Sequence, residues 1–208
     1  MNLESRIRNA QRQCLDWMVA GFPKASLERR AEQFVSLFGS HISQRAEVLD
    51  IGGGWGFYAE PLRRLRDCQV TILDVVKPAF HKAPVTTYAG EEIPFPDKSF
   101  DVSLLITMLH HVKSPEALLR EARRVTRRFI IVVEDLYRHG AGRMWTILRD
   151  RLYNLEFVGH PCQFKQKEEW LQCFQRLGLK LESEKEIYTF LLGLRILNGI
   201  FILKCADE

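Results

Sequence analysis

Hydrophobic positions along the chain alternate between short, mainly apolar runs and stretches of helical spacing. Apolar runs at 46–51, 69–73, 103–107 and 129–133 have the length of buried strands, and a shorter one lies at 85–88. Between them, apolar residues are three or four positions apart, as expected of amphipathic helices. This alternation predicts an α/β fold, a doubly wound sheet with helices on both faces and the ligand at the carboxyl ends of the strands.

Start and stop residues predict where several elements begin and end. The spacing predicts a helix that begins near Leu3 and ends near Gly21-Phe22-Pro23, and a second helix that follows Ser26 as N-cap. Further helices are expected at about 60–66, 115–125 and 141–152, with one to two helical turns at 77–82. A last helix carries Trp170, Leu171, Phe174 and Leu177 on one face and stops at Gly178. Two final strands are predicted near 179–187 and 200–205. Asn198-Gly199 offers an alternative hairpin turn there, with 190–197 as an apolar loop.

A cluster of glycines directly follows the first strand, in the run Ala-Glu-Val-Leu-Asp-Ile-Gly-Gly-Gly-Trp-Gly at 46–56. Gly52, Gly54 and Gly56 lack Cβ atoms, so the main chain can turn tightly and approach a ligand closely. A dinucleotide fingerprint, G-x-G-x-x-G, would need a glycine where the chain has Phe57. The turn therefore predicts a nucleotide-type ligand other than NAD.

An acidic residue ends the second predicted strand, because the run at 69–73 is followed by Asp74. An acid at this position of an α/β unit can accept charge-assisted hydrogen bonds from both hydroxyls of a ribose. A third segment, 91–102, contains Ile-Pro-Phe-Pro-Asp-Lys-Ser-Phe-Asp, and the strand after it ends in Leu-His-His-Val at 109–112.

Taken in order, these three motifs resemble the class I S-adenosylmethionine (SAM) methyltransferases. The type 11 branch, which includes quinone-biosynthesis C-methyltransferases, is the most similar, and the resemblance covers about residues 45–135. It implies a seven-stranded mixed sheet with strand order 3-2-1-4-5-7-6, SAM as cofactor and methyltransferase activity.

The resemblance also implies which residues contact SAM. The glycines would line its methionine and ribose, Asp74 would hold the ribose hydroxyls and Val75 would pack on the adenine. Asp50 would brace the glycine loop or bind the SAM ammonium. The usual acid for the adenine amine is replaced by Ala89, so that backbone groups nearby would serve instead. The predicted cofactor contacts are Asp50, Gly52, Gly54, Gly56, Asp74, Val75, Gly90, Glu91, Thr107 and Met108.

Methyl transfer from a sulfonium needs alignment and exclusion of water more than a protein nucleophile. A hydroxyl or carbon-acid acceptor would still need a base, and the candidates are His111, Asp135 and His139, each of which follows a predicted strand end. The fourth strand lacks the Asn/Asp-Pro-Pro-Tyr/Phe ending of DNA-adenine methylases. It also lacks a cysteine for a pyrimidine-C5 mechanism.

The length of 208 residues predicts a single methyltransferase domain over 1–208. Residues 1–40 would form a helical lid over the site or pack against the sheet edge. Residues 137–165 are expected to be a helical insertion near the acceptor site. The aromatic residues of this insertion favour a small, partly apolar acceptor molecule, although core packing would explain them nearly as well.

Charge and cysteine content limit which partners and which cellular compartment the sequence favours. The net charge is +4, but the densest arginine clusters, at 63–66 and 123–128, follow predicted helix ends away from the site, so a nucleic-acid partner is disfavoured. The five cysteines are scattered, which predicts reduced thiols in a cytoplasmic protein. We expect no signal peptide or membrane span.

No metal is expected, since His110 and His111 are adjacent and would point their rings apart along a strand end. Two rival functions stay open. One is an RNA or protein methyltransferase, if Arg138, Arg143, Arg149 and Arg151 form a basic path; the other is a SAM-binding protein without catalysis. The oligomeric state is not predicted.

Overall fold

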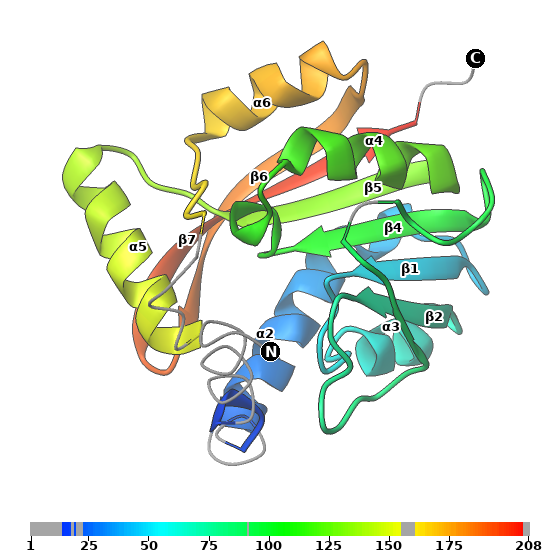
Figure 1. Cartoon of the computed structure of the whole chain (residues 1–208), viewed down its shortest axis with the longest axis horizontal. Helices are drawn as coiled ribbons and strands as arrows, with labels where there is room; N and C mark the ends of the chain where they lie inside the picture. The colour runs from blue at the N-terminus through cyan, green and yellow to red at the C-terminus, as the bar shows by residue number, and fades with distance from the viewer. Residues whose placement is uncertain (1–13, 18, 20–22, 91, 155–160, 206–208) are drawn as a thin grey trace.

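Seven strands form one sheet that lies between two layers of helices (Figure 1). The computed structural model describes residues 14–17, 19, 23–90, 92–154 and 161–205. The strands are β1 (Glu47–Ile51), β2 (Gln69–Asp74), β3 (Val85–Thr87), β4 (Phe100–Ile106), β5 (Thr126–Asp135), β6 (Lys180–Leu191) and β7 (Leu194–Lys204). Their order is β3-β2-β1-β4-β5-β7-β6. This confirms the predicted mixed sheet.

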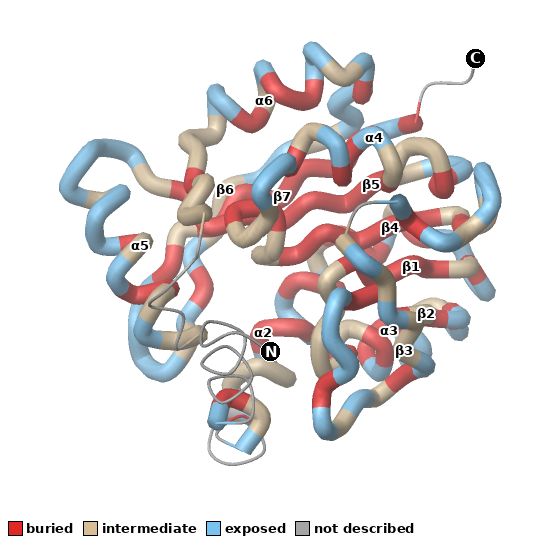
Figure 2. The backbone as a smooth tube through the Cα atoms, in the orientation of Figure 1, coloured by how far each residue is buried: buried red, intermediate tan, exposed pale blue. Residues whose placement is uncertain are grey.

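The first five strands are parallel, and β7 lies antiparallel to both β5 and β6. The central strands are buried on both faces; Ile130 to Val133 of β5 are fully buried (Figure 2). Strands buried in this way consist of nearly continuous apolar residues, which is why the sequence runs predicted them well.

Helices cover both faces of the sheet. They are α2 (Pro23–Phe38), α3 (Ala59–Arg66), α4 (Pro115–Val125), α5 (Gly140–Asn154) and α6 (Lys167–Arg176), with short 3-10 turns η1 (Gly39–His41) and η2 (Leu109–His111). On one face, Leu119 of α4 and Trp170 of α6 lie in the same buried cluster. On the other face, Phe34 of α2 and Leu62 of α3 pack against β1 and β2. No helix in the described ranges is long and apolar enough to cross a membrane.

The N-terminal segment is described only in part. The α2 helix begins at Pro23, before the predicted N-cap Ser26, because proline is well suited to the first turn of a helix. Phe34 and Phe38 are fully buried under the sheet, so α2 is part of the folded body. Most of the first predicted helix lies outside the described residues. The lid role of residues 1–40 therefore stays a prediction.

Two local predictions were wrong. Residues 77–82 form bends and no helical turn, because this segment runs alongside the glycine loop. The Lys82 N–H donates a hydrogen bond to the Trp55 carbonyl at 3.0 Å. The hairpin turn is Leu192-Gly193, where both residues have positive φ (49° and 81°), as a type I′ turn requires. Asn198-Gly199 lies inside β7, where Asn198 pairs with Ile187 of β6, so the predicted apolar loop is mostly strand.

Candidate functional site

The carboxyl ends of β1, β2, β4 and β5 lie at the same side of the sheet, which faces α5 (Figure 1). Parallel strands of a doubly wound sheet present their ligand site at this edge. The glycine loop follows β1, Asp74 ends β2, Thr107 follows β4 and Asp135 ends β5. The predicted site residues therefore come from adjacent strand ends.

The glycine loop presents bare main chain toward this edge. Gly54 has a φ of 49°, and a Cβ atom built on it would have only Asp74 Oδ2 nearby, at 4.0 Å. Gly56 has a φ of 74°, and a Cβ atom there would lie 2.5 Å from Ile72 Cδ1. The loop thus needs Gly56 for close packing on β2, whereas Gly54 leaves open space where a ligand could approach.

Asp74 joins the end of β2 to the glycine loop. Its Oδ2 accepts a hydrogen bond from the Gly54 N–H at 3.0 Å, and its Oδ1 accepts one from the Val76 N–H at 3.1 Å. A carboxylate has about four acceptor positions, so these two bonds orient it without saturating its capacity. The sequence-predicted neighbourhood of Asp74 and the glycines is present in the structure.

Asp50 provides the test of whether SAM fits. Its carboxyl group is buried at the end of β1, and its Oδ2 has no hydrogen-bond partner among the described residues. Burial, with a smaller contribution from Asp74, raises the pKa of Asp50 to about 8. A buried acceptor beside an open glycine loop suits the ammonium of a ligand, and the neighbouring Asp74 suits a ribose. The residues present therefore fit SAM.

An apolar platform lies next to Asp74. Val75 is 55% exposed, and a Cβ atom built on Gly90 would lie 3.3 Å from Val75 Cγ1. An exposed apolar side chain beside bare main chain suits a flat purine ring. Glu91, the remaining predicted adenine contact, lies outside the described residues.

The end of β4 is held by a buried carboxylate from β5. Glu134 is fully buried, and its Oε1 accepts hydrogen bonds from the N–H groups of Met108 and Leu109 at 3.0 and 2.8 Å. Thr107 just before them has a φ of 50°, which is costly for a β-branched residue. Met108 packs over Gly52, since a Cβ atom there would lie 2.9 Å from Met108 Cε. This fixed backbone borders the glycine loop.

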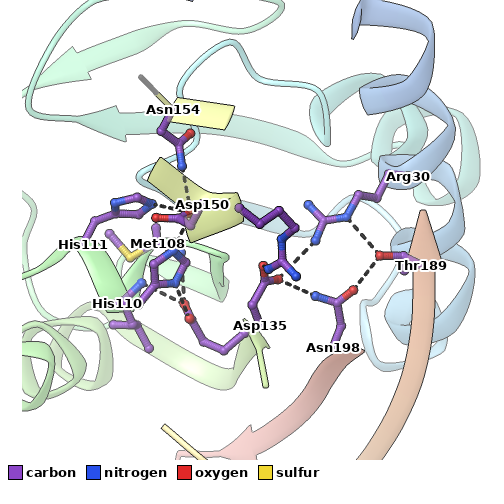
Figure 3. Close-up of polar contacts among 12 residues, drawn as sticks. Arg30, Met108, His110, His111, Asp135, Asp150, Asn154, Thr189 and Asn198 are labelled. Carbon is purple, nitrogen blue, oxygen red and sulfur yellow. Dashed lines mark hydrogen bonds and ion pairs between the residues drawn. The ribbon is translucent and has the colours of Figure 1, made fainter. Parts of the chain in front are cut away.

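Two histidines follow, in η2. His110 Nδ1 lies 2.6 Å from Glu134 Oε2, and its Nε2 lies 3.4 Å from Asp150 Oδ1 of α5 (Figure 3). Burial acts to lower the pKa of His110, but Glu134 and Asp150 outweigh it and raise this pKa to about 10. His111 Nε2 lies 3.8 Å from the same Asp150 oxygen. The ring centroids of His110 and His111 are 4.1 Å apart, so the predicted divergence of the two rings was wrong.

Asp135 is the centre of a second buried network (Figure 3). Its Oδ1 accepts hydrogen bonds from Arg30 Nη2 at 3.3 Å and Asn198 Nδ2 at 2.6 Å. Its Oδ2 accepts one from Arg149 Nη2 at 2.5 Å. Thr189 completes the network by donating to Asn198 Oδ1 at 2.6 Å and accepting from Arg30 Nε at 3.3 Å. The network ties α2, β5, α5, β6 and β7 together.

The three candidate bases thus differ in their surroundings. His111 faces the sheet edge beside Asp150 and keeps 26% of its side chain exposed. Asp135 is occupied by two arginines and an asparagine, which suits a positioning role better than proton transfer. His139 is exposed and accepts a hydrogen bond from the Gly142 N–H at 3.2 Å, so it caps the start of α5. The identity of a base stays a prediction, and this geometry favours His111.

Several residues of the two networks have no local sequence signal. Asp150 and Arg149 lie in α5, and Arg30 lies in α2, inside helices whose charged residues look like ordinary surface positions. Their burial, at 6%, 3% and 7% exposure, depends on tertiary packing alone. Two surface hollows, one lined by Tyr137 and Gln166 and one at the opposite end of the strands, include neither the glycine loop nor Asp74. The candidate site is therefore located by its side chains and not by a cavity.

Comparison with known proteins agrees with this geometry. Residues 49–129 match the model of a family described as a methyltransferase domain. An uncharacterized protein of Methanocaldococcus jannaschii, MJ1123, is 32% identical over 81 residues, which are 38% of this chain and 39% of that protein. The match therefore spans well under half of this curated relative.

Solved methyltransferase structures share most of this fold. A SAM-dependent methyltransferase from Methanosarcina mazei superposes with a TM-score of 0.64 at 17% identity, covering 83% of this chain and 98% of its own. The Burkholderia thailandensis 1,6-didemethyltoxoflavin-N1-methyltransferase, solved with its acceptor and S-adenosylhomocysteine, gives 0.63 at 15% identity, covering 88% and 79%. The chain therefore shares the fold of these methyltransferases. The segment that matches the family model, residues 49–129, contains the glycine loop and Asp74.

Proposed function

We propose that the protein transfers the methyl group of SAM to a small, partly apolar acceptor held between the glycine loop and α5. The observation that carries this proposal is the convergence of Asp50, Gly54 and Asp74 at one sheet edge inside the matched methyltransferase segment. The family match ends at residue 129, so the acceptor side of the proposal depends on the remaining elements.

The chain's own residues would hold the cofactor at both ends. Asp74 would accept the ribose hydroxyls, Val75 would cover the adenine, and Asp50 would pair with the ammonium of the methionine part. Bound SAM supplies an activated methyl group on a sulfonium, which a nucleophile can displace in line. Glu134 fixes the main chain at Met108, so the wall beside the methionine part needs no rearrangement.

The acceptor side is formed by η2 and the α5 insertion. His111 lies at its border with part of its imidazole accessible, and would take a proton from a hydroxyl, amine or carbon acid. Asp150 would orient that imidazole. The α5 helix also exposes Trp145 and Leu148, at 48% and 49%, which favours a partly apolar molecule. The small acceptor bound by the Burkholderia neighbour is consistent with such a site.

A polynucleotide acceptor receives less support. The basic path that would favour it requires open charges after β5. Arg149 is buried on Asp135, and Arg138 is paired with Glu186 at 2.7 Å. Two of the four arginines therefore carry neutralised charge, and a continuous track for phosphates is interrupted.

The function can be tested with SAM that carries a labelled methyl group. The purified chain is incubated with labelled SAM and fractionated cell extract, and the label is followed in small molecules, RNA and protein. Transfer into the small-molecule fraction supports the proposal. Label in RNA or protein contradicts the acceptor class, and binding of SAM without any transfer contradicts catalysis.

Asp74→Asn should weaken SAM binding about tenfold or more, because a neutral amide replaces an acceptor of charge-assisted hydrogen bonds worth roughly 1.5–3 kcal/mol. Isothermal titration with S-adenosylhomocysteine measures the effect. Asp67→Asn is the matched control, since Asp67 is exposed at the far end of α3 and should leave affinity unchanged. Equal affinity of wild type and Asp74→Asn would remove the ribose assignment.

A further inference from the structure

Three potential metal-ligating side chains meet beside the proposed acceptor site. His110 and His111 come from η2, and Asp150 comes from α5. One ring nitrogen of each histidine and one oxygen of Asp150 all lie within 4.8 Å of one another (Figure 3). Asp150 is distant in sequence from the two adjacent histidines, so only the docking of α5 onto the sheet edge brings the three together.

The distances suit a first-row transition metal. Four ligands bonded at about 2.0–2.1 Å in a tetrahedron lie roughly 3.3–3.4 Å apart. His110 Nε2 and Asp150 Oδ1 are separated by 3.4 Å, and His111 Nε2 lies 3.8 Å from that oxygen. A rotation of the partly exposed His111 ring would be enough to complete the arrangement.

The surrounding hydrogen bonds orient these ligands as in known metal sites. A metal-bound histidine usually donates its other ring N–H to a carboxylate, which fixes the ring and raises its basicity. Glu134 Oε2 occupies that position, 2.6 Å from His110 Nδ1. Asn154 Nδ2 donates to Asp150 Oδ1 at 2.8 Å and orients that carboxylate. Phe164 stacks on the His110 ring at a centroid distance of 4.2 Å, which further limits its rotation.

Charge balance points in the same direction. Glu134 and Asp150 place two carboxyl groups in a buried region, at 0% and 6% exposure. Both carboxylates favour a positive charge on the groups between them, and a divalent cation held by neutral imidazoles would supply it. The partial exposure of His111 leaves one side of the cluster accessible, as in metal sites with three protein ligands and an open position.

We propose that His110, His111 and Asp150 bind one divalent transition-metal ion, such as Zn²⁺, through two ring nitrogens and one carboxylate oxygen. The fourth position faces the acceptor side, where a water molecule or an oxygen or nitrogen of the acceptor would bind. With the ion bound, His111 is a ligand and not the base considered above, and polarisation by the ion would instead ease loss of the acceptor's proton. The site does not depend on SAM binding. The competing occupant is a proton on His110, which the same two carboxylates would also stabilise.

The test measures metal binding directly. The full chain is stripped with EDTA and titrated with Zn²⁺ by calorimetry, and Co²⁺ is added in parallel to record its visible absorption. We expect about one equivalent bound and the intense absorption of low-coordinate Co²⁺. His111→Gln should lower Zn²⁺ affinity tenfold or more, because it removes one of three ligands. His139→Gln is the matched control and should bind as wild type does, since His139 is exposed at the start of α5.

Each other outcome overturns the proposal. No stoichiometric binding by the wild-type chain would assign the cluster to a proton. If His111→Gln and Asp150→Asn both bind Zn²⁺ as wild type does, the metal lies elsewhere. If a variant fails to fold, the wild-type titration still shows whether the chain binds a metal ion. S-adenosylhomocysteine binding is measured on the same samples and should persist in His111→Gln. Failure of the metal site is therefore distinguishable from failure of the proposed function.

Discussion

Asp135→Ala is expected to destabilise the protein by about 3–5 kcal/mol. Removing this carboxylate leaves Arg30 and Arg149 buried, at 7% and 3% exposure, without their shared counter-charge. Breaking a buried ion pair by deleting one partner has effects of this size, because the remaining charge keeps its desolvation penalty. Chemical denaturation of the ligand-free chain measures the loss of free energy of unfolding.

The comparison variant is Glu186→Ala, which breaks the more exposed ion pair with Arg138. This change should cost at most about 1 kcal/mol, since solvent screens the interaction. A double-mutant cycle of Asp135→Ala and Arg149→Ala should show a coupling of roughly 1 kcal/mol or more, because the two side chains are in direct contact. If Asp135→Ala costs no more than Glu186→Ala, the network does not stabilise the fold.

The size of this effect bears on catalysis as well. An aspartate that joins β5 to three other elements through three donors is better explained as a positioning residue than as a base. In that case Asp135→Ala would lower the stability of the acceptor side as a whole, because Arg149 lies next to Asp150 in α5. Loss of methyl transfer in this variant should therefore accompany loss of stability.

The sheet and the contact between Asp74 and the glycine loop could be predicted because their signals are local. Each buried parallel strand is a continuous apolar run, and the glycine loop and Asp74 follow directly from strand ends. The buried network around Asp135 could not be predicted in the same way. Arg30 and Asp135 are 105 positions apart, and nothing in either helix or strand alone marks them as partners. Their contact exists only after α2 and the sheet have packed.

The prediction for the two histidines failed for a different reason. Neighbouring residues on a strand point to opposite faces, but β4 ends at Ile106, and His110 and His111 lie in a 3-10 turn. Successive side chains in such a turn are about 120° apart, so both rings can contact one group on a neighbouring element. Thr107, with its positive φ, ends the strand and starts this change of direction. Because position 107 holds neither glycine nor proline, the end of the strand could not be recognised from the sequence.

Asp50→Asn is expected to weaken S-adenosylhomocysteine binding by about ten- to a hundredfold. The carboxylate would accept a charge-assisted hydrogen bond from the ligand's ammonium, worth roughly 1.5–3 kcal/mol, and an amide cannot replace its charge. Because the pKa of Asp50 is about 8 in the ligand-free chain, its carboxyl group is mostly protonated at pH 7. Ion pairing with the ammonium would therefore release close to one proton on binding.

Calorimetric titration at pH 7 in buffers of different ionisation enthalpy measures that proton directly. The wild type should release it and Asp50→Asn should not, whereas Asp74→Asn should lose affinity but keep the release. This contrast separates the two roles considered for Asp50. Unchanged affinity and proton release in Asp50→Asn would mean that the side chain only braces the glycine loop.

Although Asp50→Asn should weaken ligand binding, it should stabilise the ligand-free chain relative to wild type as pH rises. The pKa of Asp50 is raised on folding, from 3.8 to about 8, so the folded chain keeps a proton that the unfolded chain has released. Stability from this group is present below pH 3.8 and is lost between pH 4 and 8, by at most about 1.4 kcal/mol per pH unit. Relative to wild type, Asp50→Asn should therefore gain roughly 2.5 kcal/mol of stability between pH 5 and 7. Folding alone would favour asparagine at this position because the neutral variant is more stable, whereas ligand binding favours aspartate. An equal dependence of stability on pH in the two proteins would contradict this explanation.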